Sequence, residues 1–207
     1  MNRGKLYIIS APSGAGKTSL VKQLIAGLDQ VTVSVSHTTR AMRVGENEGK
    51  DYFFSTVDEF KQMVANKDFL EHAQVFDNFY GTAQKTVECY LDDGIDVILE
   101  IDWQGAQQVR KMLPDNVSIF ILPPSIEVLQ QRLENRGQDS QEIISRRMQD
   151  AVQEMSHCEE FNYLIVNDDF NLALSELRGI VVSHRLEKQR QLKKLAPLLE
   201  QLIARDD

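Results

Sequence analysis

The stretch LYIISAPSGAGKT, residues 6–18, decides the fold of this chain. An apolar run is followed by a turn that contains Gly14 and Gly16, and a helical pattern begins directly after the turn. A strand, a glycine-rich turn and a helix in this order are typical of a phosphate-binding loop. The glycines let backbone N–H groups turn toward phosphate oxygens, Lys17 adds positive charge, and the Thr18 hydroxyl can reach Mg²⁺. The stretch therefore predicts a site for a phosphorylated ligand at the end of a core strand.

The same rhythm of an apolar run followed by a helical pattern repeats along the chain. The expected strand and helix pairs are Leu6–Ile9 with Thr18–Leu28, Val97–Ile101 with Gly105–Leu113, Ile119–Leu122 with Ile126–Leu133, and Tyr163–Val166 with Leu172–Val182. Strands that are apolar along their whole length are typical of a parallel sheet covered by helices on both faces. The predicted fold class is α/β.

Two segments interrupt this rhythm and divide the single domain expected over residues 1–207. Between about 37 and 88 short strand patterns dominate, and a capping box at Thr56 and Glu59 opens a helix, so we expect an inserted mixed α/β subdomain. A polar stretch at 134–140 precedes a helix expected to run to about Glu160, which predicts a small helical lid at about 126–150. The core then comprises about 1–36, 89–125 and 151–207.

The C-terminal stretch from Arg185 is helical by pattern, with leucines on one side and a kink expected at Pro197. It is interpreted as a packing helix or as a contact in a homo-oligomer.

Composition excludes several classes of partner. The 207 residues are 42% hydrophobic and 26% charged, which is typical of a globular chain, and the net charge of -8 repels nucleic acid and anionic membrane surfaces. No run approaches the roughly 20 apolar residues of a membrane span. Cys89 and Cys158 lack metal-ligand spacing, so a reducing cytoplasm is the expected compartment.

Two kinds of charged side chain mark a site for anions and a metal ion. Glu100 and Asp102 end a nearly all-apolar strand and are expected on one face of it, where they are predicted to hold Mg²⁺ or its water shell opposite the loop. Arginines gather in the two interrupting segments, where they predict two anionic ligands approached from either side. These arginines are Arg40 and Arg43 in the first segment and Arg132, Arg136, Arg146 and Arg147 around the second.

Together these features resemble guanylate kinase, the P-loop family that moves the terminal phosphoryl group of ATP onto GMP. The resemblance extends from about Leu6 to Asp169, and its bacterial form is the most similar. It rests on residues 10–18, 33–40, 49–54, 69–73, 80–82, 99–105, 132–137 and 165–169. It implies a P-loop parallel sheet flanked by helices, a GMP-binding insert, a small helical lid, ATP and GMP as substrates, and Mg²⁺ with ATP.

The resemblance also implies the GMP site. The residues matched to the GMP phosphate are Arg40, Arg43, Tyr52 and Tyr80, and those matched to the guanine are Ser36 and Glu71. Thr82 is a further GMP-binding position, where it keeps the hydroxyl of the serine that is common in the family. A carboxylate accepts hydrogen bonds from N1–H and the 2-amino group of guanine, whereas adenine offers neither, so Glu71 predicts selection of GMP. Glu100 is expected to contact either GMP or a metal-bound water.

On the ATP side, the resemblance implies binding by Ser13, Gly14, Ala15, Gly16, Lys17, Thr18, Arg132, Arg136 and Asn167. The expected catalytic side chains are Lys17, Arg40, Arg136 and Arg147, and Thr18 and Asp102 are expected to bind Mg²⁺ directly or through water. The GMP phosphate is mostly ionised at neutral pH because its second pKa is near 6, so the reaction needs no general base.

Two other functions compete with this interpretation. Asp102-Trp103-Gln104-Gly105 reads as the D-x-x-G of a GTP-hydrolysing switch, but the expected N-K-x-D is approached only by Asn66-Lys67-Asp68-Phe69. A scaffold module that binds peptides in an old GMP pocket is the other alternative, and an intact Lys17 and Thr18 argue against it. An assay for ADP formation with ATP and GMP separates the three.

Overall fold

The central layer of the molecule is a five-stranded parallel sheet. The computed structural model of the chain describes residues 2–75, 77–135 and 141–203. The strands are β1 (Leu6–Ser10), β2 (Val31–Val33), β7 (Asp96–Glu100), β8 (Asn116–Leu122) and β9 (Tyr163–Val166), in the order β2-β7-β1-β8-β9. Each neighbouring pair is parallel, as in Leu6 opposite Val97 and Leu6 opposite Asn116. The predicted α/β class is confirmed.

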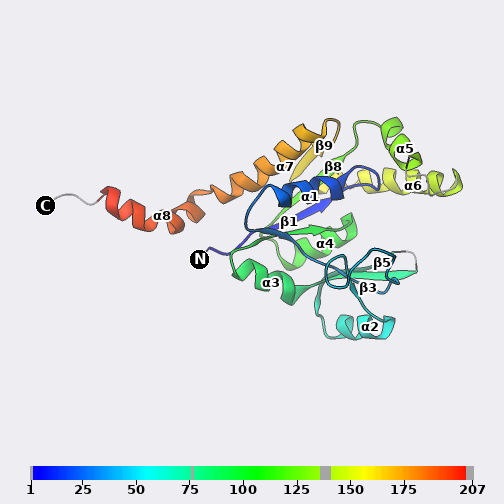
Figure 1. The fold of residues 1–207 in the computed structure, drawn as a ribbon, viewed down its shortest axis with the longest axis horizontal. Coiled ribbons are helices and arrows are strands. Elements are labelled where there is room, and N and C mark those ends of the chain that lie inside the picture. Colours follow the sequence, from blue (N-terminus) through cyan, green and yellow to red (C-terminus); the bar gives the residue numbers. More distant parts are fainter. Residues whose placement is uncertain (1, 76, 136–140, 204–207) are drawn as a thin grey trace.

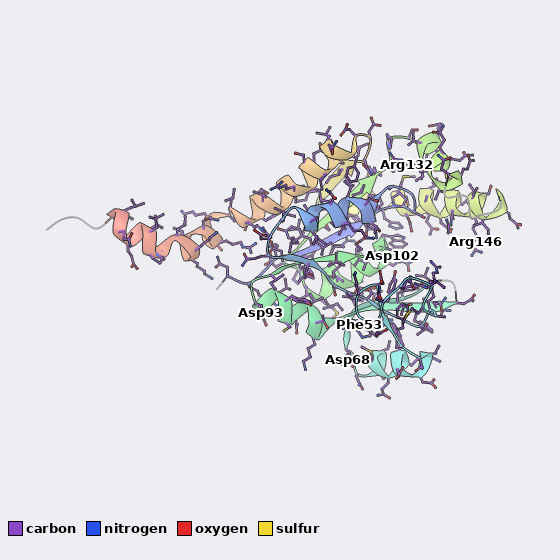
Figure 2. All side chains as sticks on the ribbon, viewed as in Figure 1. Phe53, Asp68, Asp93, Asp102, Arg132 and Arg146 are labelled. Atoms are coloured by element: carbon purple, nitrogen blue, oxygen red, sulfur yellow. The ribbon has the colours of Figure 1, made fainter. Side chains whose placement is uncertain are left out.

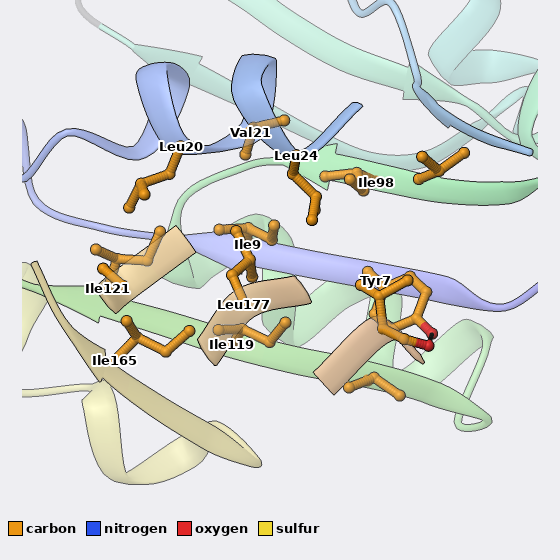
Figure 3. Close-up of a cluster of buried hydrophobic side chains, with 14 of the residues drawn as sticks. Tyr7, Ile9, Leu20, Val21, Leu24, Ile98, Ile119, Ile121, Ile165 and Leu177 are labelled. Atoms are coloured by element: carbon orange, nitrogen blue, oxygen red, sulfur yellow. Dashed lines mark hydrogen bonds between the residues drawn. The ribbon is translucent and has the colours of Figure 1, made fainter. Parts of the chain in front are cut away.

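Helices cover both faces of this sheet, and β1 shows why (Figure 1). The helices α1 (Lys17–Ala26) and α7 (Phe170–Arg185) lie on one face, and α3 (Gln84–Asp92) and α4 (Trp103–Met112) lie on the other. Alternate side chains of a strand point to opposite faces. Tyr7 and Ile9 are therefore buried against the first pair of helices, as Figure 3 shows for Ile9 with Leu20 and Leu177, while Leu6 and Ile8 are buried against the second pair.

A second, smaller sheet forms most of the segment between β2 and α3. Its strands are β3 (His37–Thr38), β4 (Phe53–Phe54), β5 (Phe69–Val75) and β6 (Asn78–Ala83), in the order β4-β3-β6-β5, with β5 and β6 antiparallel. The helix α2 (Val57–Ala65) begins at the expected capping box, since Thr56 and Glu59 exchange side-chain and backbone hydrogen bonds. This sheet lies beside the core at the side of α3 and α4 (Figure 1).

Two further helical parts project from the core in opposite directions. The helices α5 (Ile126–Glu134) and α6 (Gln141–Met155) pack together at one end, and α8 (Lys188–Ile203) extends from the other end (Figure 1). No helix among residues 2–75, 77–135 and 141–203 has the length and apolar character to cross a membrane.

Two segments leave their regular structure earlier than their sequence patterns suggest. The alternating residues 31–36 would suit a single strand, but β2 ends at Val33, because the chain leaves the first sheet there and enters the second sheet at His37. The helix expected to reach Glu160 ends at Met155 and is followed by a short 3₁₀ turn, Cys158–Glu160. In both cases a pattern that looks continuous in sequence is interrupted in the structure.

Asp96 ties four elements together at the amino end of the central sheet. It is 1% exposed, and its carboxylate accepts the Lys5 N–H at 2.7 Å and the Arg185 Nε at 2.7 Å, with Arg190 of α8 at 3.4 Å. We expect Asp96→Asn to lower the free energy of unfolding by about 3 kcal/mol, because it leaves two partly buried guanidinium groups without the buried charge that they pair with. Urea denaturation measures this loss. Asp92→Asn is the matched control, since Asp92 pairs with Arg3 on the surface. Equal losses in the two variants would contradict the argument.

Candidate active site

The phosphate-binding loop lies between β1 and α1, as its spelling predicts. Gly14 and Gly16 have φ of 94° and 93°, a backbone conformation that side chains rarely tolerate. A Cβ on Gly16 would also lie 2.4 Å from the Nδ2 of Asn167. That amide donates a 2.7 Å hydrogen bond to the Ala15 carbonyl, and Asn167 is 5% exposed. The loop is therefore held from behind by a residue 152 positions away in sequence.

Lys17 stands among three carboxylates. Burial lowers the pKa of the Lys17 ammonium, and Glu100, Glu154 and Asp102 oppose that shift by favouring its charged form. Glu100 ends β7 and accepts a 3.0 Å hydrogen bond from the Thr18 hydroxyl. Glu100 therefore lies next to the phosphate-binding loop, on the strand beside β1.

Asp102 has a different local role from Glu100. The strand β7 ends at Glu100, and Asp102 is the N-cap of α4, where its carboxylate accepts the Gly105 N–H at 2.7 Å. The two acids therefore do not form one continuous strand face, because an aspartate that precedes a helix is recruited to satisfy a free backbone N–H. Its negative charge still acts on both Lys17 and Glu71.

The oxygen atoms of Thr18 and Glu100 fit a magnesium ion. Mg²⁺ prefers oxygen ligands and usually keeps water and substrate phosphates around one or two protein carboxylates. A hydroxyl and a carboxylate beside the loop match that pattern. No group of three or more His, Cys, Asp or Glu side chains that could hold a metal occurs among the residues that the structure describes.

A buried carboxylate marks the second half of the site. Glu71 of β5 is 5% exposed, and the Thr82 hydroxyl of the neighbouring strand β6 donates a 2.5 Å hydrogen bond to it. Burial raises the pKa of Glu71 to about 7; Asp102 adds to the rise and the Thr82 hydrogen bonds oppose it. The other carboxylate oxygen faces Gly105 at the start of α4, where a Cβ would lie 3.0 Å from it. The insert thus presents a fixed acceptor pair to the core.

The basic and phenolic side chains expected at the GMP phosphate also meet. The Arg40 guanidinium lies 5.4 Å from the centre of the Tyr52 ring and close to the Tyr80 hydroxyl, and the two tyrosine rings are 6.0 Å apart. Burial raises the pKa of the Tyr52 phenol, with smaller contributions from neighbours that include Glu100 at the end of β7. Arg43 is exposed in the same loop.

Glu46 is a member of this cluster that the sequence did not reveal. Its carboxylate accepts Arg40 Nη2 at 2.7 Å and the Arg43 backbone N–H at 2.8 Å. The hydrogen bond from Arg40 is the main cause that holds the pKa of Glu46 below its usual range. An acid three residues after Arg43, beside Gly45, was the available signal. The pairing itself depends on how the loop folds.

The helices α5 and α6 contribute arginines, of which Figure 2 labels Arg132 and Arg146, and one unexpected acid. Arg132 of α5 donates a 3.0 Å hydrogen bond to the Asn167 carbonyl, and its other terminal nitrogen is buried with no partner in the described part of the chain. Arg146 is exposed and Arg147 half-buried on α6. Arg136 lies outside the described residues. Glu154, near the end of α6, faces Lys17, and sequence reasoning missed it. The available signal was an acid bordering the packed positions Ile144 and Ala151.

Comparison with known proteins agrees with this geometry. The sequence model of the family described as guanylate kinase matches residues 3–184. A guanylate kinase of Methylococcus capsulatus is 59% identical over 203 residues, which are 98% of this chain and 100% of that protein. One of Hahella chejuensis is 61% identical over 186 residues, 90% of this chain and 89% of that protein.

A solved structure agrees as well. The crystal structure of guanylate kinase from Anaplasma phagocytophilum has a TM-score of 0.74 and 37% identity to this chain, and the match covers 97% of this chain and 96% of that one. A loop built for phosphates, a buried carboxylate facing it from an inserted sheet, and a family match over most of the sequence lead to one conclusion: the chain belongs to the guanylate kinase family.

Proposed function

We propose that the loop of residues 10–18, the insert and the lid divide the guanylate kinase reaction among the side chains described above. The activity is ATP-dependent phosphorylation of GMP, which gives ADP and GDP. The observation on which the assignment of roles depends most is the buried Glu71, held by Thr82 and turned toward the start of α4. A buried carboxylate is costly unless it is paired, so a ligand that donates hydrogen bonds is its natural partner.

Guanine is read by Glu71, Thr82 and Ser36 in this proposal. The ionised Glu71 accepts from N1–H and the 2-amino group, while Thr82 keeps the carboxylate in one orientation, and Ser36 donates to O6. Adenine would place a lone pair of N1 against the carboxylate and would leave it without donors. The orientation of Glu71, rather than the size of a pocket, then selects GMP.

The GMP phosphate is held by Arg40, Arg43, Tyr52 and Tyr80. Cations and phenol donors suit a phosphate dianion. In the protein as described, Glu46 takes the hydrogen bond of Arg40 that a phosphate would compete for. Glu100 acts electrostatically on both Tyr52 of the GMP side and Lys17 of the ATP side. This supports our placing of the GMP phosphate next to the ATP phosphates at the carboxyl end of β7.

The triphosphate is bound by residues 13–18, with Lys17 beside the transferred group. Arg132, Arg136 and Arg147 supply the remaining positive charge, and Asn167 lies behind the loop, close to where we place the adenine. Thr18 and Glu100 would hold the Mg²⁺ that accompanies ATP, and Asp102 would contact it through a bound water. When bound, the ion neutralises charge on the ATP phosphates. Lys17, Arg40, Arg136 and Arg147 are the proposed catalytic residues.

The transfer itself requires positioning and charge stabilisation. A GMP phosphate oxygen attacks the γ-phosphorus while the bond to the ADP oxygen breaks, and no proton has to be removed from the nucleophile. Two anions repel each other, so the arginines of the insert and lid make their approach possible. The boundaries of the core, insert and lid given above are part of this proposal.

An assay of ADP formation tests the proposal. With ATP we expect GMP to be used at least about a hundredfold more efficiently than AMP, CMP or UMP, because only guanine satisfies Glu71. Equal use of AMP would overturn the proposed reading of guanine. Phosphate release from GTP without GMP would favour the switch-type alternative instead.

A homo-oligomer stays a prediction. The helix α8 exposes Leu192, Leu198 and Leu202 along its length. Sedimentation equilibrium measures the oligomeric state directly.

A further inference from the structure

The side chain of Glu154 occupies an unusual place for an acid. It lies at the end of α6, and its carboxylate faces the backbone N–H of Ser13 in the phosphate-binding loop. Its Oε2 is buried and has no hydrogen-bond partner among the residues that the structure describes. A buried acceptor without a donor costs free energy, so this arrangement needs a reason beyond packing.

The charges around Glu154 come from several elements. Lys17 of α1 favours its ionised form, whereas Asp102 at the start of α4 and Asp150 on its own helix oppose it. Burial is the largest influence and raises the pKa of Glu154 to about 7. Lys17 and the Ser13 N–H therefore both attract this carboxylate.

The same two groups are the ones that a triphosphate uses. Backbone N–H groups of such a loop and its lysine bind phosphate oxygens. A carboxylate resembles a phosphate in carrying negative oxygens that accept hydrogen bonds. Glu154 and the nucleotide phosphates are thus competitors for a donor and a cation in the loop.

We propose that Glu154 is a positioning residue that holds the loop and Lys17 in the nucleotide-free protein, and that the nucleotide phosphates displace it and release α6 from the loop. The inference rests on the proposed function, since it takes the loop as the ATP site. This role accounts for the unpartnered Oε2. The carboxylate holds the loop in the conformation that binds phosphate, and because it competes with the nucleotide phosphates it also lowers nucleotide affinity.

The chain contains a built-in reporter for such a release. Its single tryptophan, Trp103, stacks on His157 with ring centres 3.5 Å apart and an angle of 8°. His157 is three residues beyond Glu154 and two residues after the end of α6. A movement of the end of α6 would alter this stack and with it the fluorescence of Trp103.

Nucleotide binding to the whole protein provides the test. In Glu154→Gln, the amide keeps the size and one acceptor oxygen but loses the charge, so we expect ADP, measured calorimetrically with EDTA present, to bind about three- to tenfold more tightly than to wild type. Inorganic pyrophosphate should also bind more tightly to Glu154→Gln than to wild type, by a similar factor, whereas the affinity for GMP should be the same in both proteins. Glu142→Gln, in the exposed first turn of the same helix, is the matched control and should leave ADP binding unchanged.

Three outcomes would overturn the inference. One is unchanged or weaker binding of ADP to Glu154→Gln, and another is an equal gain in Glu142→Gln. The third needs no variant: if saturating ADP leaves Trp103 fluorescence of the wild type unaltered, α6 is not released. Wild-type turnover of GMP is measured separately, so failure of the proposed function is distinguishable from failure of this inference.

Discussion

Lys17→Met is expected to lower kcat for GMP phosphorylation by about a thousandfold or more, since charge stabilisation of the transferred phosphoryl group is the main catalytic contribution in this reaction class. Methionine has a similar length and no charge. The loop backbone would still bind nucleotide, because Gly14, Gly16 and the Asn167 hydrogen bond to Ala15 do not depend on the ammonium. The loss should therefore appear mainly in kcat, measured by the coupled ADP assay.

The control for this variant is Lys22→Met. Lys22 is exposed on the same helix, so its replacement removes an equal charge at a distance from the loop. We expect its kcat to stay within about twofold of wild type, because surface charges interact weakly through water. Transfer by Lys17→Met at a tenth of the wild-type rate or more would contradict the role given to Lys17.

Glu71→Gln is the second substitution with a large expected effect. The amide offers one acceptor and one donor where two acceptors are needed, so a donor would face a donor on guanine. We expect kcat/KM for GMP to fall by about a hundred- to a thousandfold, with much of the preference over AMP lost. The ADP assay with GMP and with AMP gives the ratio of the two kcat/KM values. Asp77→Asn removes an exposed carboxylate from the turn of the same β5–β6 hairpin and should leave the ratio unchanged.

The pKa of Glu71 adds a pH signature to the same variant. Because burial raises this pKa to about 7, the carboxyl is largely protonated below pH 7 in the unliganded protein, and GMP requires the ionised form. Affinity for GMP should thus increase from pH 6 to pH 8 in wild type. The GMP phosphate titrates near pH 6 in both proteins, so the difference between wild type and Glu71→Gln isolates Glu71.

Stability should show the opposite trend. The folded protein binds the Glu71 proton more tightly than the unfolded chain does, so this group contributes stability at low pH that is lost as the pH rises toward and through 7. Glu71→Gln removes that loss and should be more resistant to urea than wild type at pH 8. If the variant is less stable than wild type at pH 8 and shows the same pH dependence of GMP affinity, the buried carboxylate does not have the role assigned here.

Local sequence patterns were sufficient for the phosphate-binding loop and for the start of the helix in the insert. The left-handed conformation of Gly14 and Gly16 and the capping box at Thr56 depend on residues within a few positions, and the sequence displays them directly. The buried parallel strands were equally visible, because a strand covered on both faces has to be apolar throughout. These features settle the α/β class and the place of the phosphate site.

The partners of the charged groups were not visible in this way. Asp102 was expected beside Glu100 on a strand, yet the free N–H of Gly105 makes it a helix cap. Glu46 and Glu154 were not recognised at all, because an acid in a loop or on a helix looks like an ordinary surface residue until the fold places Arg40 or Ser13 against it.

The amino-acid sequence by itself thus determined that this chain builds a parallel α/β core with a phosphate-binding loop and, by family resemblance, that it transfers phosphoryl groups to GMP. Only the tertiary structure decided which carboxylate meets which donor: Thr18 with Glu100, Glu71 with Thr82, and Glu154 with Ser13. The physical reason is that backbone conformation responds to neighbours in sequence, whereas hydrogen bonding and desolvation depend on groups that folding brings together from distant positions.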